Sequence, residues 1–239
     1  MFDLEEHLWW YVGMRAVTAS ILDRELDHAD SPRLLDVGCG TGFSLTWLRD
    51  RFFAHEAFGV DVSPHAAALW RLRDLDTVAV ASADSLPFAA AEFYLVTCFD
   101  VIYQLDTMEA QTAIAEIGRV LKPGGLLFIR EPAYEWMKGA HDLAVGTRHR
   151  YTRNELGLLL KSAGLTPRRT THVNMLLFWA AVPHRLISRL RGVDHSDVKP
   201  VPHLINALFT FILELEARLV GRVTFPFGLS LVVLAEKSG

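Results

Sequence analysis

Three glycines at alternate positions, Gly38, Gly40 and Gly42, follow an apolar run that begins at Leu34. Glycine adopts positive φ without strain and leaves its backbone bare, so a ligand can lie directly against such a turn. The amides that open a following helix would point outward as donors. The pattern is typical of a nucleotide-binding turn between a strand and a helix. The third glycine comes one residue earlier than in the dinucleotide fingerprint, which argues against a nicotinamide-linked reductase.

Two acids near this turn limit the charge of the ligand. Asp36 lies at the end of the first apolar run, where a carboxylate repels a phosphate and attracts an ammonium. Asp61 follows a second apolar run over 57–60, about 20 residues beyond the turn, where a Rossmann-like unit offers a carboxylate to ribose hydroxyls. The pair favours a nucleoside ligand with a positive group over a ligand with phosphates.

Residues 34–42, Leu-Leu-Asp-Val-Gly-Cys-Gly-Thr-Gly, resemble the first motif of the class I S-adenosylmethionine (SAM)-dependent methyltransferases of the small-molecule type. The resemblance implies an α/β fold with a Rossmann-like, doubly wound sheet of seven mostly parallel strands in the order 3-2-1-4-5-7-6. It also implies SAM as cofactor, S-adenosylhomocysteine as product, no metal, and a single domain over 1–239. Further segments match the family in order: the acid after strand 57–60, strand 77–81 with the loop 83–88, strand 93–99, and the turn 121–125 before strand 126–129.

The resemblance implies donor-binding roles for residues at the ends of the strands. Asp36 and the turn backbone would bind the methionine portion, Asp61 the ribose hydroxyls, and Asp84 the exocyclic amine of adenine. Val62 and Leu86 would sandwich the adenine ring, or would serve the core alone. The remaining positions of this predicted donor site are Gly38, Cys39, Gly40, Gly42, Ala83, Ser85 and Phe99.

Two positions depart from the family pattern. Tyr94 stands where members usually carry an aspartate at the start of the fourth strand, far from the end where ligands bind, so we interpret it as structural. Gln104 stands where many members carry a histidine, so a mechanism that uses that histidine does not transfer. Gln104 and its neighbour Tyr103 can still hydrogen-bond a substrate. Asp100, at the end of the same strand, would face either the sulfonium or the acceptor.

The segment after the fifth strand is predicted to form the acceptor side, because loops at the carboxyl ends of strands hold substrates in doubly wound sheets. Tyr134 and His149 are its candidate substrate-binding residues. His149 is also, with Asp100, a candidate catalytic residue, since an imidazole titrates near neutral pH and could take a proton from the acceptor. A surface role for this histidine is the competing interpretation.

The N-terminal segment 1–30 is predicted to be a cap helix over the donor, because apolar residues recur at near-helical spacing from Leu4 to Leu22. In the resembling family such a helix turns Tyr11 and Arg15, one turn apart, toward the donor. Arg15 would pair with the donor's carboxylate. The aromatic group that ends at Tyr11 would cover the cofactor or pack on the sheet.

Three elements complete the predicted frame of the site. Thr152 and Glu155 have the spacing of a capping box, which predicts the start of a helix over 154–163. Apolar patterns predict a sixth strand around 170–176 and a last strand over 229–235.

The insertion between these last two strands, 177–222, is the least family-like part of the chain. Its first half is a basic amphipathic pattern, and its second half, 202–220, is apolar around most of a helix. We interpret the insertion as a lid that shapes a hydrophobic acceptor pocket, as a homodimer interface, or as a peripheral membrane contact. A membrane span is disfavoured because polar residues interrupt it, namely Asn206, Glu214, Glu216 and Arg218.

Composition excludes several other classes of protein. The chain has 239 residues, of which 51% are hydrophobic, and a net charge of −4, which argues against a nucleic-acid partner. The end of the fourth strand also lacks the Asn-Pro-Pro-Tyr segment of base-amine methyltransferases. Two cysteines and scattered histidines predict neither disulfides nor a metal site, and the absence of a signal-peptide pattern favours the cytoplasm.

Together the motifs predict a SAM-dependent methyltransferase that acts on an O, N or C atom of a small, fairly apolar acceptor, such as an isoprenoid, an aromatic compound or a lipid-linked sugar. The chemistry asks mainly for positioning, because a sulfonium is already a strong methylating agent. The alternative is a non-catalytic SAM-binding subunit or regulator with the same fold.

Overall fold

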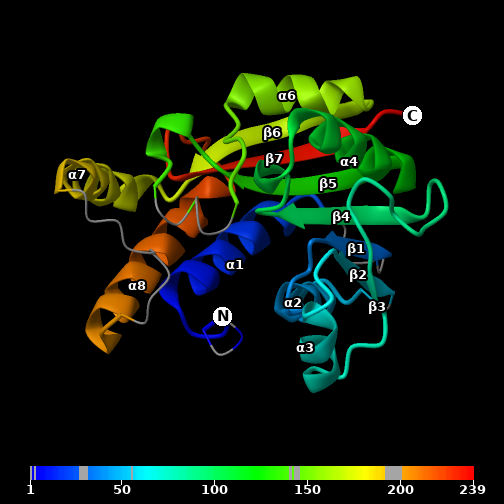
Figure 1. The fold of residues 1–239 in the computed structure, drawn as a ribbon, viewed down its shortest axis with the longest axis horizontal. Helices are drawn as coiled ribbons and strands as arrows, with labels where there is room; N and C mark the ends of the chain where they lie inside the picture. The colour runs from blue at the N-terminus through cyan, green and yellow to red at the C-terminus, as the bar shows by residue number, and fades with distance from the viewer. Residues whose placement is uncertain are drawn as a thin grey trace.

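A computed structural model describes residues 2, 4–26, 32–54, 56–139, 142, 146–191 and 201–239, and over 184–191 it describes the backbone alone. Its seven-stranded sheet has the order β3-β2-β1-β4-β5-β7-β6, so the predicted fold and strand order are confirmed (Figure 1). β7 runs antiparallel to β5 and β6. The strands are β1 Leu34–Val37, β2 Ala57–Asp61, β3 Val78–Val80, β4 Phe93–Phe99, β5 Leu121–Pro132, β6 Leu165–Val173 and β7 Ser230–Lys237.

Helices cover both faces of this sheet. α4 and α6 lie on one face, and α1, α2 and α8 lie on the other (Figure 1). Each face has its own apolar core, which explains why β1 is buried at all four of its positions. The helices are α1 Trp9–Leu22, α2 Phe43–Arg51, α3 Ala66–Leu72, α4 Thr107–Val120, α6 Arg153–Ser162, α7 Met175–Arg191 and α8 His203–Val220.

Local sequence signals predicted the start of α6 correctly, but they misplaced β6 and the turn at 121–125. Thr152 and Glu155 form the predicted capping box at the start of α6. The predicted sixth strand, 170–176, is wrong at both ends, because β6 begins at Leu165 and ends at Val173. Asn174 adopts a φ of 61° and so ends the strand before α7 begins. The predicted turn at 121–125 lies within β5 as an irregularity of the pairing with β4.

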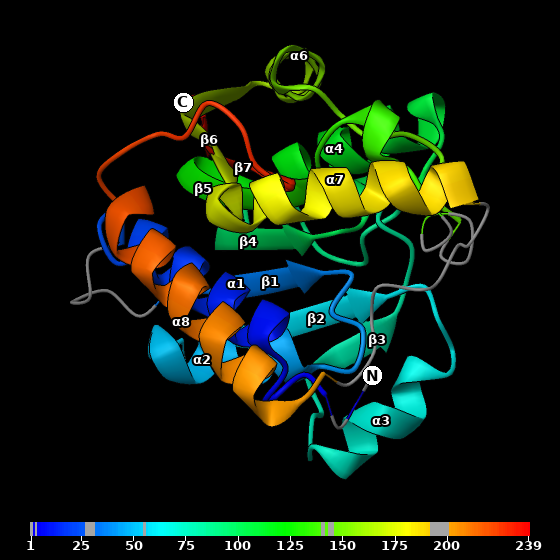
Figure 2. The ribbon, with the colours of Figure 1, turned by 90° about the vertical axis from the view of Figure 1, so that its left-hand side faces the viewer.

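α8 packs along α1 across the sheet, and the two helices lie side by side in Figures 1 and 2. A Cβ on Gly13 would stand 2.3 Å from a Leu213 methyl carbon, so this glycine sets how closely the helices approach. The Asn206 side chain accepts the Trp9 amide at 2.8 Å and caps α1. Asn206 interrupts the apolar pattern of α8, and its role is therefore to cap the start of α1.

Glu216 plays the same part for α7. It is fully buried, and its carboxylate accepts the amides of Asn174, Met175 at 2.8 Å and Leu176 at 3.1 Å. Burial raises the pKa of Glu216, and the three amides act in the opposite direction. A carboxylate at a helix N-terminus satisfies donors that have no partner within the helix.

Replacing Glu216 by Ala should lower the free energy of unfolding by about 2–3 kcal/mol, because buried amides at the start of α7 lose their acceptor. Glu216→Gln should cost less, since its amide oxygen still accepts. Glu214→Ala, at an exposed position on the same helix, is the matched control and should change stability by less than about 0.5 kcal/mol. Urea unfolding measures all three, and equal losses for positions 214 and 216 would contradict the capping role.

The outer face of α8 carries a row of exposed apolar residues, namely Leu204, Leu208, Phe211, Leu215 and Leu219. The opposite face of the helix packs on α1, and the lid interpretation of the insertion stays a prediction. The exposed row stays a predicted contact surface for a second copy or a membrane. Across the described residues, no helix is both long and apolar enough to cross a membrane.

Candidate functional site

The glycine turn between β1 and α2 has the backbone geometry that its sequence predicts. Gly38, Gly40 and Gly42 have φ values of 76°, 52° and 83°. A Cβ on Gly38 would stand 2.2 Å from a Val101 methyl carbon, whereas a Cβ on Gly40 would meet no described atom within 4 Å. The turn is therefore closed by the protein at Gly38 and open to a ligand at Gly40.

The amides of the turn are less free than the sequence suggests. Gly38 and Cys39 both donate to the Val60 carbonyl, at 2.8 and 3.0 Å, and Gly40 donates to Asp61 at 2.8 Å. The Cys39 side chain lies in the core, where burial raises the pKa of its thiol. Cys39 thus supports the turn from beneath, and its contact with a donor stays a prediction.

Asp61 joins the end of β2 to the turn. One of its carboxylate oxygens accepts the Gly40 amide and the other accepts the Ser63 amide, each at 2.8 Å. These two charge-assisted bonds hold the carboxylate at the carboxyl edge of the sheet. A carboxylate has about four acceptor positions, so Asp61 keeps capacity for two ribose hydroxyls.

Asp36 is buried within β1, on the same edge. The Thr97 hydroxyl of β4 donates to one of its oxygens at 2.7 Å, and the other oxygen has no partner among the described residues. Burial raises the pKa of Asp36 to about 7, while the Thr97 bond and the charge of Arg130 act to lower it. A buried carboxylate oxygen without a partner is a suitable contact for an ammonium group.

We expect the affinity for S-adenosylhomocysteine to rise by up to about tenfold between pH 6 and pH 8, because the ligand's ammonium favours the ionised form of Asp36. Binding near pH 7 should release a proton. Calorimetric titration in two buffers with different ionisation enthalpies measures both effects. Asp36→Asn should bind more weakly and lose the pH dependence; a variant that keeps it would assign the titration to another group.

Of the two apolar residues predicted to sandwich the adenine ring, one is exposed to solvent. Val62 is 70% exposed, whereas Leu86 is buried in the core. Glu116 accepts the Leu86 amide at 3.0 Å, and Arg119 donates to the Leu86 carbonyl at 3.1 Å. Leu86 is therefore part of the core and Val62 is accessible, and the contact of either with the adenine ring stays a prediction. Ala83, Asp84 and Ser85 are at least partly exposed in the loop, and their contacts with adenine stay predictions.

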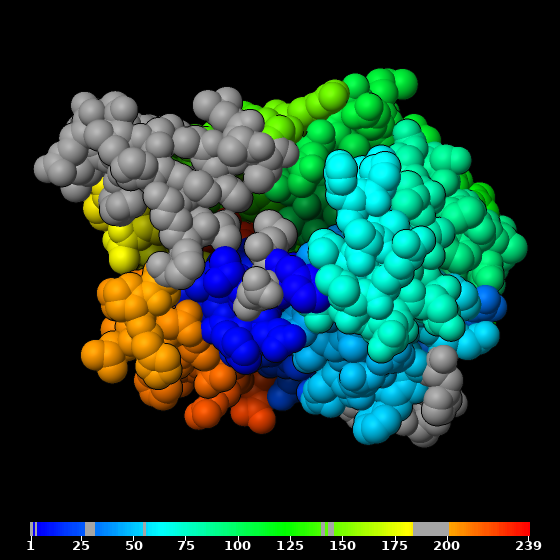
Figure 3. All heavy atoms as spheres, turned by 60° about the horizontal axis from the view of Figure 1, so that its bottom comes forward, coloured from blue at the N-terminus to red at the C-terminus, as the bar shows by residue number. Residues whose placement is uncertain are grey.

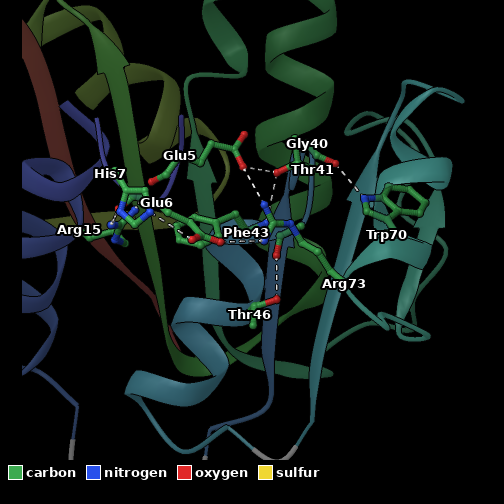
Figure 4. A network of polar contacts seen from close by, with 11 residues as sticks. Glu5, Glu6, His7, Arg15, Gly40, Thr41, Phe43, Thr46, Trp70 and Arg73 are labelled. Carbon is green, nitrogen blue, oxygen red and sulfur yellow. Dashed lines mark hydrogen bonds and ion pairs between the residues drawn. The ribbon is translucent and has the colours of Figure 1, made fainter. Parts of the chain in front are cut away.

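The segment before α1 lies on the glycine turn, between α8 and the segment that contains α3 and β3 (Figure 3). Glu5 is buried there, and its carboxylate accepts the Thr41 hydroxyl and lies 3.5 Å from Arg73 (Figure 4). Burial raises the pKa of Glu5, against the effects of Thr41 and Arg73. No spacing in the sequence predicts these contacts, because they join three distant parts of the chain.

Arg15 holds this N-terminal segment in place. Its guanidinium donates to the carbonyls of Glu5 and Glu6, at 2.7 and 3.0 Å, and lies 4.8 Å from the centre of the Phe43 ring (Figure 4). The side chain is therefore bound within the protein, where the sequence predicts a contact with the donor's carboxylate. That contact stays a prediction.

The ends of β4 and β5 carry a partly buried ion pair. Asp100 adopts a φ of 56°, and its carboxylate pairs with Arg130 of β5. The Arg130 guanidinium lies 4.8 Å from the centre of the Trp10 ring and 4.9 Å from that of Phe99. Burial, and then the charges of Glu5 and Asp100, raise the pKa of Tyr11 to about 12. The cap helix and the end of β4 thus both contact Arg130, through Trp10 and Phe99.

A residue absent from the predicted site, Glu131, supports the loop after β4. It is fully buried, and its oxygens accept the amides of Val101, Ile102 and Tyr103 at 3.2, 3.1 and 3.2 Å. These amides open the short helix η1 Ile102–Gln104. Burial raises the pKa of Glu131 well above its usual value, as does the charge of Asp100. An acid at the end of an apolar strand was the sequence signal for it.

Tyr103 and Gln104 lie together among the predicted acceptor residues, and Tyr134 belongs to a different cluster of rings. Gln104 donates to the Tyr103 hydroxyl at 3.1 Å, and burial raises the pKa of Tyr103 to about 12. Tyr134, beyond the end of β5, stacks on His172 with ring centres 5.4 Å apart. His172 is buried, which lowers its pKa. These rings can shape an apolar acceptor pocket, and neither tyrosine is placed to act as a base near pH 7.

The backbone of His149 lies beside Tyr103, because its amide donates to the Tyr103 carbonyl at 3.1 Å, but its side chain points elsewhere. Its Nε2 lies 3.6 Å from a Glu155 oxygen, and its ring meets Tyr151 edge-on with centres 4.7 Å apart. The structure therefore brings His149 to the start of α6 and records no contact with Asp100, the other candidate catalytic residue. Within the described residues, no group of three or more His, Cys, Asp and Glu side chains could hold a metal ion.

Comparison with known proteins identifies the family of the chain. Residues 35–129 match the family described as "Methyltransferase domain". The malonyl-acyl-carrier-protein O-methyltransferase of Geobacter sulfurreducens is 31% identical over 80% of this chain and 78% of its own. The ubiquinone/menaquinone biosynthesis C-methyltransferase UbiE of Syntrophotalea carbinolica is 33% identical over 56% of each chain. The chain spans less than two thirds of that relative and of the O-methyltransferase of Coxiella burnetii, of which it covers 66%.

Solved structures share the fold. A SAM-dependent methyltransferase from Mesorhizobium loti superposes with a TM-score of 0.61 at 17% identity, over 95% of this chain and 98% of that one. The (4+2)-cyclase SpnF superposes with a TM-score of 0.58 at 26% identity, over 94% of this chain and 80% of that one. The sheet order and glycine turn define a Rossmann-like nucleoside-binding domain. The chain belongs to the class I SAM-dependent methyltransferases.

Proposed function

We propose that this protein transfers a methyl group from SAM to an O, N or C atom of a small, fairly apolar acceptor. The observation that carries the proposal is the open backbone at Gly40. It lies directly beside the Asp61 carboxylate, which accepts hydrogen bonds from two backbone amides. Asp36 would hold the ammonium and Asp61 the ribose. The rings at the ends of β4 and β5 would exclude water, and bound SAM would supply an activated methyl group.

The relatives support this class of reaction. Their names include an O-methyltransferase that acts on a malonyl group and a C-methyltransferase of quinone biosynthesis, so the shared domain serves more than one acceptor atom. The two cysteines are free and buried, which supports the cytoplasm as the proposed location.

Calorimetric titration with S-adenosylhomocysteine tests the donor site. We expect micromolar binding to the wild type, a loss of at least about 100-fold in Asp61→Ala, and no binding of NAD, the control ligand. Asp61→Ala removes the acceptor of the Gly40 amide as well as the predicted ribose contact. Wild-type protein that fails to bind S-adenosylhomocysteine would overturn the proposal.

One observation favours a second candidate, a SAM-binding protein that performs no methyl transfer. The solved relative at 26% identity is named a cyclase. Incubation with methyl-labelled SAM and an extract of small metabolites separates the two candidates. A labelled product supports transfer, and S-adenosylhomocysteine binding without any labelled product supports the second candidate.

A further inference from the structure

Arg130 has an unusual position for a positively charged side chain. It lies on β5, its side chain is only 9% exposed, and the rings of Trp10 and Phe99 flank its guanidinium. Its Nε and Nη2 both donate to Asp100. Its Nη1 makes no hydrogen bond to any residue that the structure describes. Aromatic faces hold the plane of a guanidinium in one orientation, so this free edge is fixed.

The ion pair with Asp100 leaves part of the Arg130 guanidinium available to a second anion. A guanidinium has five N–H donors, and Asp100 uses only one edge of it. The Nη1 edge of the guanidinium therefore keeps donors that an incoming acceptor can use. A carboxylate matches the remaining edge in charge and geometry.

Three candidate bases at this end of the sheet have partners, and Asp36, which has a free oxygen, is assigned to the ammonium of the donor. Asp100 is paired with Arg130, Glu131 accepts three amides, and His149 lies against Glu155. An alcohol or an amine would need such a base to lose its proton during transfer. A carboxylic acid is already ionised at pH 7, so it can attack a methyl group without one.

We propose that the free edge of Arg130 binds the carboxylate of an acidic acceptor, and that this carboxylate takes the methyl group. One carboxylate oxygen forms the new bond to the methyl carbon as the sulfur–methyl bond breaks. The sulfur keeps the electron pair, so the products are a neutral methyl ester and S-adenosylhomocysteine. This inference rests on the proposed function and narrows its acceptor.

The donor also carries a carboxylate, but the position of Arg130 in the sheet favours the carboxylate of the acceptor as its partner. The groups proposed for the donor, Asp36, Gly40 and Asp61, lie on or beside β1 and β2. Arg130 lies on β5, with β4 between it and β1. Neighbouring strands are about 4.8 Å apart, so the backbone of Arg130 lies about 10 Å from the backbone of β1.

Hexanoate and hexanamide are suitable probes, because they share an apolar tail and differ in charge. Saturation-transfer NMR on the protein loaded with S-adenosylhomocysteine should detect hexanoate and not hexanamide. Arg130→Met should lose at least about tenfold in hexanoate affinity, and Arg130→Lys should lose less. Asp100→Asn should bind hexanoate more tightly than the wild type, a gain that a purely structural ion pair would not produce.

Arg33 offers the matched control. It also lies over two rings, Phe58 and Phe93, and pairs with Glu92 at 2.7 Å, but at the amino end of the sheet. Arg33→Met should leave hexanoate binding unchanged. Calorimetry with S-adenosylhomocysteine completes the test: a loss of tenfold or more in Arg130→Met would assign Arg130 to the donor's carboxylate and overturn the inference.

Equal binding of the acid and the amide, or binding of neither, would overturn the inference while leaving the proposed function intact. Failure of the wild type to bind S-adenosylhomocysteine would instead overturn the proposed function. A thermal melt of each variant separates loss of binding from loss of fold.

Discussion

Alanine at Gly38 and alanine at Gly40 should fail in different ways. Gly38→Ala should lower the free energy of unfolding by about 2–4 kcal/mol, because its Cβ meets a Val101 methyl at 2.2 Å and its φ is 76°. Gly40→Ala should cost only about 1 kcal/mol, since its φ is 52° and its Cβ meets no described atom. The Cβ of Gly40→Ala should nevertheless lower the affinity for S-adenosylhomocysteine by at least about 100-fold, because it would occupy the space of the donor.

Urea unfolding and calorimetry on both variants measure the two effects separately. The double variant Gly38→Ala with Val101→Ala should recover the part of the loss that comes from the clash and keep the part that comes from φ. If Gly40→Ala folds and binds S-adenosylhomocysteine like the wild type, then the donor does not lie against this turn.

Local sequence signals predicted the parts of the site that depend on backbone geometry. The positive φ values of the turn follow from glycine alone, and the capping box of Thr152 and Glu155 needs only four consecutive residues. The order of the strands followed from the family resemblance, and the structure has the same order. These features need no knowledge of which side chains meet across the fold.

The contacts that sequence reasoning missed join residues far apart in the chain. Glu5 meets Thr41 and Arg73, and Glu216 meets the start of α7. In a sequence pattern such acids resemble surface charges or interruptions of an apolar helix. Their partners are fixed only when α1, α7 and α8 dock on the sheet. The direction of His149 toward Glu155 is likewise set by packing and not by spacing.

Glu131→Ala should impair both stability and methyl transfer, because Glu131 connects β5 to the loop after β4. The variant leaves the buried amides of Val101, Ile102 and Tyr103 without their acceptor, which should cost on the order of 3 kcal/mol in unfolding free energy. Transfer should fall by at least about 100-fold, since Asp100 and Tyr103 lie in the loop that these bonds hold. Glu131→Gln keeps one oxygen acceptor, so its stability and its transfer rate should lie between those of the wild type and those of Glu131→Ala.

Glu109→Ala is the matched control for this prediction. Glu109 also accepts a backbone amide, that of Asp106, but at the exposed start of α4, so its loss should cost less than about 1 kcal/mol and leave transfer unchanged. Urea unfolding, S-adenosylhomocysteine calorimetry and turnover of labelled SAM are the measurements. The donor groups lie on β1 and β2, so donor affinity should change by less than about threefold in Glu131→Ala. If donor affinity instead falls as steeply as turnover, Glu131 supports the donor site and not the placement of the acceptor.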